Sequence, residues 1–424
     1  MKNQRLSAAK LLQRILDQGR PSAGLLGLRP AGRPDHAAHA CAVYVYGVLQ
    51  HKNLLDYISR RLSTFQPKLP PVAANVLRVS LYSLLFQETP MYAVAAEAAK
   101  ALARYGKYKK YVHKLLLLAA EQGPAIRAEL LQRGTDPAAL SVRYSLPIWL
   151  VKQLGRQFAG RRQDILDAYQ QRPNLYIRFP AANLPPSHGL LQTTSLPEVF
   201  QVRGRRLPEL LAALRETGLP WYIQSLSSAC LSRLMPACPN MRILDLTTGK
   251  GGKLLHLADL YGNQADYTAF CHDASDKPFL LQNMRQWHME TAIRVTSDPA
   301  ALAEASYTHV LVDAPCSGSG IIGKYPEIRF RITREALSHM QALQGRLLAR
   351  AAKLAAPGGY VLYSTCSILA QENEHWLQHT PAGMTLEQPL RQGVPPEYFM
   401  QGMFRALPCY GVDGMTALLW RRGD

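Results

Sequence analysis

The stretch MRILDLTTGKGGKLLHLADLY at residues 241–261 decides the fold class. Its first six residues are mostly apolar and predict a buried strand, and a glycine-rich loop then leads into a predicted helix at 253–261. The same alternation continues downstream, with strands predicted at 267–271, 308–312 and 360–363 and helices at 278–288 and 334–355. Alternation at this length is typical of a doubly wound, mostly parallel sheet. Residues 219–424 are therefore expected to form an α/β, Rossmann-like domain.

The chain upstream of that domain has two parts. Residues 1–133 carry apolar side chains at helical spacing without a strand-like segment, which predicts an antiparallel helical bundle. The proline-rich stretch 134–218 is either a small α+β module or a structured linker. It contains predicted strands at 175–179 and 198–202 and a predicted helix at 208–216. The length of 424 residues allows three domains, at about 150 residues each.

Charge is distributed unevenly along the chain. Residues 1–133 hold 20 Lys and Arg against 7 Asp and Glu, residues 134–215 hold 11 against 5, and residues 216–424 hold 18 against 18. The whole formal charge of +19 therefore lies in the first half. A basic module attached to a neutral domain indicates that the basic part binds a polyanion. The alternative, a charge that serves solubility alone, is less favoured.

Composition excludes several classes of protein. Apolar residues make up 47% and charged residues 19% of the chain, which excludes full-length disorder. The longest apolar run falls far short of the roughly 18 residues that a membrane span needs, and the first residues lack a signal peptide's apolar core. Seven cysteines without regular spacing fit neither a disulfide framework nor a zinc site. We expect a cytoplasmic monomer with reduced thiols, no metal and no membrane attachment.

The glycine-rich loop is a candidate cofactor site. Glycines let backbone amides approach a ligand, and the helix N-terminus that follows favours an anion. Asp273 ends the next strand, 22 residues after Gly251, where a carboxylate would accept hydrogen bonds from ribose hydroxyls. The loop lacks both the dinucleotide pattern Gly-x-Gly-x-x-Gly and the phosphate-loop pattern Gly-Lys-Ser/Thr. An adenosine compound without a pyrophosphate, such as S-adenosyl-L-methionine, therefore fits better than a dinucleotide.

Two cysteines follow predicted strand ends. Cys316 lies in DAPCSGSG at 313–320, and Cys366 lies in YSTCS at 363–367. Because catalysts in open α/β sheets gather at the carboxyl ends of strands, both thiols and the Asp313 carboxylate are expected to converge beside the cofactor loop. The remaining cysteines are expected to be small buried hydrophobes, namely Cys41, Cys230, Cys238, Cys271 and Cys409.

These two motifs resemble the signatures of the RsmB/Nop/NSUN RNA 5-methylcytosine methyltransferases. The resemblance extends to five further segments: LRVSLYSLLF at 77–86 with Pro90 after it, RYSLPIWL at 143–150, KYPEIR at 324–329, MFRALP at 403–408 and VDGM at 412–415. It is closest to the RsmB branch, which implies a NusB-like helical RNA-binding domain at 1–133 and a class I methyltransferase domain at 219–424. That branch implies small-subunit ribosomal RNA as the substrate, with transfer RNA as the alternative.

Two departures from the family pattern keep another class open. The family's loop usually reads CAAPGGK, whereas this chain has TTGKGGK at 247–253, with Lys250 where the family has proline. Cys271 and His272 stand where the family usually has small or aliphatic residues. The alternative is a non-catalytic RNA-binding or ribosome-assembly factor whose altered loop binds the cofactor weakly.

The resemblance implies roles for individual catalytic residues. Cys366 would add to carbon 6 of cytosine, and Cys316 would assist release of the product. The swapped assignment stays open, because DNA cytosine methyltransferases use a Pro-Cys cysteine as the nucleophile. Asp313 would stabilise charge at ring nitrogen 3, and Lys253 would lower a thiol pKa or position the base.

The resemblance also implies how the cofactor would be held. Its methionine end would lie against the loop residues Thr247, Thr248, Gly249, Lys250, Gly251, Gly252 and Lys253. Asp273 would bind the ribose, Asp298 would lie by the adenine, and Asp313 would border the site. For Asp298, an ordinary turn or cap carboxylate is the alternative.

RNA contacts are expected from the basic first half. Residues 107–111 interleave cations with aromatic rings, which suits phosphate binding and base stacking. The candidate contacts are Lys107, Lys109, Lys110, Arg161, Arg162, Arg205 and Arg206. For each cluster alone, a solvated helix or loop face is the alternative. The target cytosine must leave any stack to reach Cys366, so an unpaired cytosine is expected.

Overall fold

The computed structural model describes residues 3–22, 36–183, 189–204 and 207–424. Contacts divide the chain into two compact units, one of residues 1–171 with 322–332 and one of residues 172–321 with 333–424. The predicted middle stretch is shared between them, since 134–171 belong to the first unit and 172–218 to the second. The division into three domains at 133 and 218 remains a prediction.

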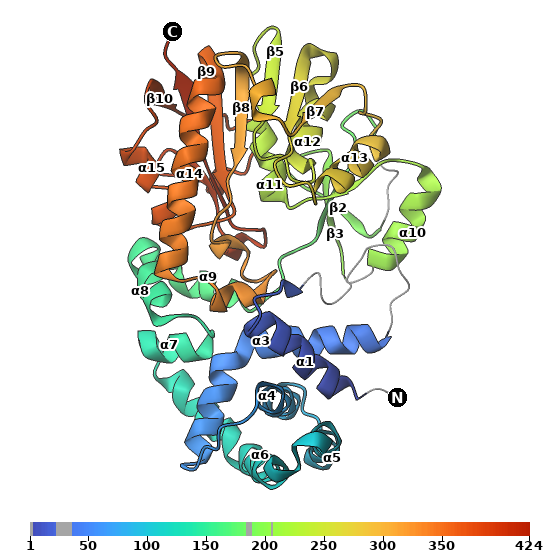
Figure 1. The fold of residues 1–424 in the computed structure, drawn as a ribbon, viewed down its shortest axis with the longest axis vertical. Helices are drawn as coiled ribbons and strands as arrows, with labels where there is room; N and C mark the ends of the chain where they lie inside the picture. Colours follow the sequence, from blue (N-terminus) through green and yellow to red (C-terminus); the bar gives the residue numbers. More distant parts are fainter. Residues whose placement is uncertain (1–2, 23–35, 184–188, 205–206) are drawn as a thin grey trace. The chain divides into compact units, whose positions relative to one another are not determined.

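The first unit is built from helices, as the apolar spacing predicts (Figure 1). They are α1 (Gln4–Leu16), α3 (His36–Leu62), α4 (Pro71–Phe86), α5 (Met91–Ala101), α6 (Lys109–Gln132), α7 (Pro137–Arg143), α8 (Ile148–Gln157) and α9 (Arg162–Ala168). Leu49, Val76 and Leu116 are fully buried in its core. Proline begins α4 and precedes α5, because a residue without an N–H fits the first turn of a helix.

A segment from much later in the chain completes this unit. Residues 322–332, which include a short 3-10 helix at Pro326–Phe330, place the Arg329 guanidinium in the interior with 1% exposure. It donates to the carbonyl oxygens of Tyr144 and Ile322, both at 3.2 Å, and to that of Tyr169. The conspicuous KYPEIR motif therefore has a structural role in the first unit.

The second unit contains a nine-stranded mixed sheet. Its parallel part has the order β9-β8-β5-β6-β7, with bounds β5 (Met241–Asp245), β6 (Ala265–Phe270), β7 (Ile293–Thr296), β8 (Tyr307–Asp313) and β9 (Ala355–Thr365). Figure 1 shows these strands side by side. An antiparallel part adjoins β9, made of β10 (Met384–Glu387), β11 (Phe399–Met400), β12 (Met403–Ala406) and β13 (Met415–Arg422).

Apolar layers cover both faces of this sheet. Successive residues of a strand point to opposite faces, so Ile243 packs in one cluster with Leu254, and Leu244 packs in another with Leu348. The α-helices that follow residue 225 in this unit are α11 (Leu226–Cys230), α12 (Gly252–Tyr261), α13 (Lys277–Gln286), α14 (Arg334–Leu354) and α15 (His375–Gln378). The expected doubly wound, Rossmann-like domain is confirmed.

A second, antiparallel sheet belongs to the same unit. Its order is β2-β3-β1-β4, with bounds β1 (Tyr176–Arg178), β2 (Leu191–Thr193), β3 (Val199–Val202) and β4 (Tyr222–Ile223). The helix α10 (Leu207–Thr217) packs on it through Leu210, Leu211 and Leu214. The predicted strands at 175–179 and 198–202 are β1 and β3, whereas β2 and β4 are too short to leave a period-2 pattern. Within the described residues no helix is long and apolar enough to cross a membrane.

Candidate functional site

The two motif cysteines meet at the carboxyl edge of the parallel sheet. β8 and β9 are parallel neighbours, and their register puts Asp313 beside Ser364. The loops that leave these strands bring Cys316 Sγ to 3.2 Å from Cys366 Sγ. Neither cysteine is in a disulfide, and both residues are partly exposed.

An ion pair lies next to the thiols. Lys253, in the first turn of α12, places its Nζ 2.5 Å from Asp313 Oδ2. Ser364 Oγ donates to Asp313 Oδ1 at 2.9 Å, and the Asp313 N–H donates to Thr247 Oγ1 at 2.7 Å. Burial alone would lower the pKa of Lys253, but the charge and hydrogen bond of Asp313 outweigh burial and raise it. The amine therefore stays charged.

The glycine-rich loop joins β5 to α12 with backbone conformations that favour glycine. Gly249 has φ +52° and Gly251, the N-cap of α12, has φ +86°. A Cβ on Gly251 would lie 2.5 Å from Leu280, whereas one on Gly249 would meet nothing closer than 3.9 Å. Thr248 Oγ1 donates to the Asp245 carbonyl at 2.8 Å and so closes the turn. The Lys250 ammonium lies 4.8 Å from the ring centre of Phe279.

Asp245 is a site residue that the sequence analysis missed. It ends β5, is 2% exposed, and accepts a hydrogen bond from the Thr247 N–H at 3.1 Å. Burial raises its pKa to about 7. The available signal was its place at the end of the predicted strand, directly before the glycine-rich loop.

The two carboxylates proposed for the ribose and the adenine follow the next two strands. Asp273 comes shortly after β6 and accepts a hydrogen bond from the Ser275 N–H at 2.8 Å, which lowers its pKa. Asp298 comes after β7 and caps a short 3-10 helix by accepting from the Ala300 N–H at 2.9 Å. Both side chains are exposed, so their remaining oxygen lone pairs can accept from a ligand.

Three buried residues behind the cysteines were also missed. Gln344, Glu372 and Asn373 are fully buried and bond to the two cysteine loops. The sequence offered only a weak signal, the acidic and amide residues QENE at 371–374 shortly after the second cysteine motif. Of the other cysteines, Cys41, Cys230 and Cys271 are buried, while Cys238 and Cys409 are partly exposed.

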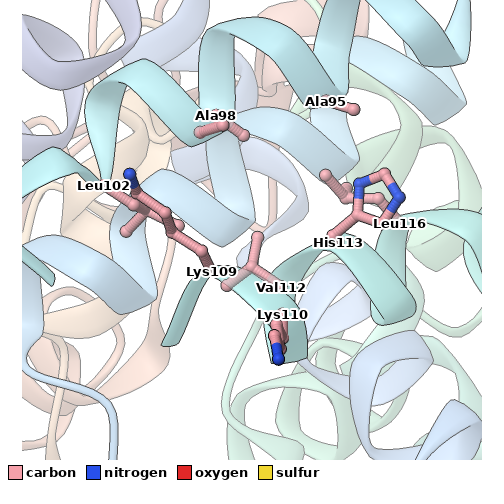
Figure 2. Close-up of a pocket in the computed structure, with 9 residues that line it drawn as sticks. Ala95, Ala98, Leu102, Lys109, Lys110, Val112, His113 and Leu116 are labelled. Carbon is pink, nitrogen blue, oxygen red and sulfur yellow. The ribbon is translucent and has the colours of Figure 1, made fainter. Parts of the chain in front are cut away.

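The predicted RNA contacts lie mostly in the first unit. Lys109 and Lys110 line a pocket of about 240 Å³ between α5 and α6, whose walls are Ala95, Ala98, Ala99, Leu102, Val112, His113 and Leu116 (Figure 2). The Lys107 ammonium lies 5.1 Å from the ring centre of Tyr108. Arg161 precedes α9, and Arg162 begins it and donates to the Thr135 carbonyl at 3.4 Å. Arg205 and Arg206 lie outside the described residues.

Fold and site together define a methyltransferase-type domain preceded by a helical domain. Residues 233–415 match the family described as 16S rRNA methyltransferase RsmB/F, and residues 2–112 match the NusB family. The chain therefore joins a NusB-type domain to a methyltransferase domain of the RsmB/F type. Across the described residues, no group of three or more His, Cys, Asp or Glu could hold a metal ion.

Named relatives and solved structures agree with this assignment. The chain is 27% identical over 404 residues to ribosomal RNA small subunit methyltransferase B of Erwinia tasmaniensis, covering 92% of this chain and 91% of the relative. It is 25% identical over 431 residues to the protein of the same name from Salmonella paratyphi C, covering 95% and 98%. Its fold resembles the crystal structure of PH0851, with a TM-score of 0.76, 23% identity and coverage of 100% and 99%. It also resembles the crystal structure of NSun6 from Pyrococcus horikoshii with SFG, with a TM-score of 0.52 and 16% identity. That match covers 66% of this chain and 98% of the other.

Proposed function

We propose that this chain is an S-adenosylmethionine-dependent RNA cytosine-5 methyltransferase acting on small-subunit ribosomal RNA. The observation that carries the proposal is the pair of sulfurs 3.2 Å apart, beside the ion pair of Lys253 and Asp313. Carbon 5 of cytosine is a weak nucleophile, and a thiolate that adds to carbon 6 turns the ring into an enamine that is reactive at carbon 5. The names of the curated relatives support small-subunit ribosomal RNA as the substrate.

The charges around the two thiols support Cys366 as the nucleophile. The hydrogen bond with Cys366, followed by burial, raises the pKa of Cys316 well above its usual range. Cys316 therefore keeps its proton and can donate it to the Cys366 sulfur. Cys366 is among the groups whose charge raises the pKa of the Lys253 ammonium, so a positive charge lies within electrostatic reach of this sulfur.

The bond changes assign a role to each group. The Cys366 sulfur bonds to carbon 6, and the electron pair moves toward carbon 5 as the ring takes up a proton from solvent at nitrogen 3. That N–H donates to the Asp313 carboxylate, which stabilises the charge. After carbon 5 is methylated, its proton leaves to a base. The electrons of that C–H bond restore the ring double bond as the bond from carbon 6 to sulfur breaks. Cys316, next to that sulfur, assists this elimination.

S-adenosyl-L-methionine, when bound, supplies the methyl group as a sulfonium. The loop at 247–253 fits it, because Gly249 leaves open space where a side chain would stand and the amides of α12 follow directly. Asp273 and Asp298 offer carboxylate oxygens at the next two strand ends for the ribose and the adenine. The charge of Lys250 lies against Phe279 of α13.

The test is transfer of labelled methyl groups to naked small-subunit ribosomal RNA and to bulk transfer RNA. The proposal predicts label in 5-methylcytosine of the ribosomal RNA, lost in Cys366→Ala. Label in transfer RNA alone would keep the chemistry and change the substrate. No label in either RNA, together with no detectable cofactor binding, would contradict the proposal and favour a non-catalytic assembly factor.

A further inference from the structure

We propose that Glu372 and Asn373 are positioning residues that together fix the separation of the Cys316 and Cys366 sulfurs. Both are fully buried, and they stand next to each other at the end of the short 3-10 helix Ala370–Glu372. One side chain bonds to the first cysteine loop and the other to the second. The geometric part of this inference stands on the contacts alone, and its catalytic part rests on the proposed function.

Glu372 holds the loop that carries Cys316. Its Oε1 accepts from the Ser317 N–H at 2.7 Å, and its Oε2 accepts from Ser317 Oγ at 2.5 Å. Gln344 Nε2 of α14 donates both to Glu372 Oε1, at 3.1 Å, and to the Pro315 carbonyl, at 2.9 Å. The residues on both sides of Cys316 are thus bonded to one buried carboxylate and its amide partner.

Asn373 holds the loop that carries Cys366 in the same way. Its Oδ1 accepts from Thr365 Oγ1 at 2.8 Å, and its Nδ2 donates to the carbonyls of Ser367, at 3.1 Å, and Leu369, at 2.9 Å. The residues before and after Cys366 are therefore both bonded to this amide. Because a side-chain amide carries both a donor and an acceptor, it can bond to acceptor and donor groups of the same tight loop.

Breaking the hydrogen bonds of Glu372 and Asn373 costs free energy, which makes the two cysteine loops rigid. A buried carboxylate or amide that loses a partner costs the full desolvation of the group left unpaired, so the loops cannot shift without that cost. Catalytic groups held in this way keep their geometry while a substrate enters. With both loops fixed from adjacent positions of one segment, the distance between the sulfurs depends on that segment.

We call Glu372 and Asn373 together the clamp. Its two residues make different kinetic predictions under the proposed function. Loosening the Cys366 loop with Asn373→Ala should slow formation of the covalent enzyme–RNA adduct. Loosening the Cys316 loop with Glu372→Gln should slow release, so the adduct accumulates. A merely structural role would lower both steps together. Glu374→Gln is the matched control, since Glu374 is the next residue and its carboxylate pairs with Arg405, at 2.5 Å.

The decisive experiment needs neither RNA nor cofactor. The full-length protein is treated with diamide, which takes two electrons and two protons from the thiols as they form a disulfide, and the rate of the Cys316–Cys366 linkage is followed by mass spectrometry. We expect rates at least about tenfold below wild type in Glu372→Gln and Asn373→Ala, because ångström-scale displacement of reacting atoms has effects of that order. Glu374→Gln should match wild type.

Wild-type rates in both folded clamp variants would overturn the inference. If circular dichroism shows that these variants do not fold, Ser317→Ala and Thr365→Val replace them, since each removes one hydroxyl donor to the clamp at almost constant shape. The same criterion then applies. Failure of methyl transfer by the wild type would contradict the proposed function and leave the diamide result to decide the geometry alone.

Discussion

Lys253 Nζ lies 2.5 Å from Asp313 Oδ2, although the two residues come from different elements, the first turn of α12 and the end of β8. The pair joins the glycine-rich loop to the strand that leads into the first cysteine motif. A third residue from β9, Ser364, donates to the other carboxylate oxygen at 2.9 Å. The charge pair and the two cysteine motifs therefore lie at the same edge of the sheet.

Asp313→Asn should lower the turnover number for methyl transfer by about a hundredfold, the usual cost of one preorganised electrostatic contact. The amide keeps the shape but cannot balance the Lys253 ammonium. Methyl transfer under saturating cofactor measures the effect, with Glu374→Gln as the control. Turnover within a few-fold of wild type would remove Asp313 from the account of catalysis.

The stability of the protein should depend on the protonation of Asp245. Burial raises the pKa of this carboxyl from 3.8 to about 7, so its proton stabilises the folded state. That contribution is full below about pH 4 and is lost as the pH rises through about 7. Asp245→Asn cannot ionise, so its melting temperature relative to wild type should increase between pH 4 and pH 8. A difference independent of pH would show that Asp245 stays ionised in the fold.

Arg329→Lys should destabilise the first unit. The buried guanidinium donates to four carbonyl oxygens, those of Tyr144, Tyr169, Ile322 and Pro326, and burial lowers its pKa to about 9. A lysine ammonium cannot reproduce that planar set of donors, and losing charged hydrogen bonds costs about 2–3 kcal/mol. Chemical denaturation measures the loss. Arg331→Lys is the control, since the Arg331 side chain is exposed.

The basic surface of α6 and the turn before it should bind RNA through phosphates. Lys107→Ala and Lys110→Ala should each reduce the slope of log affinity against log salt by about one, with little change in sequence preference. Lys100→Ala is the matched control, because that ammonium already pairs with Glu97 at 3.0 Å. An unchanged slope in both test variants would move the RNA contact away from this surface.

The local sequence pattern was sufficient to predict the parallel half of the sheet. Residues 241–246 are mostly apolar, as in a buried strand, and glycines follow at 249, 251 and 252. The structure has β5 and α12 there. The long α3 was less clear, because the polar residues 51–53 interrupt its apolar spacing and suggest a break. Interior contacts of Leu54, Leu55 and Ile58 keep the helix continuous. The antiparallel strands β10 to β13 are mostly short, and their pairing depends on partners far along the chain.

The candidate site likewise contains residues that the sequence locates and residues that it does not. Motifs locate Cys316 and Cys366 because both follow strand ends, and the sheet register brings those ends together. The clamp residues Glu372 and Asn373 could not be found by that rule, because their role arises from burial against two loops that are 50 residues apart in the chain. Asp245 resembles any strand-end aspartate until its burial is known.

The central claim is that Cys366 attacks the base and Cys316 releases it. The most direct measurement is denaturing electrophoresis of Cys316→Ala and Cys366→Ala after incubation with small-subunit ribosomal RNA and S-adenosyl-L-methionine. The account predicts a covalent protein–RNA band in Cys316→Ala and none in Cys366→Ala. A band in Cys366→Ala alone would reverse the two roles, and no band in either variant would contradict the covalent mechanism.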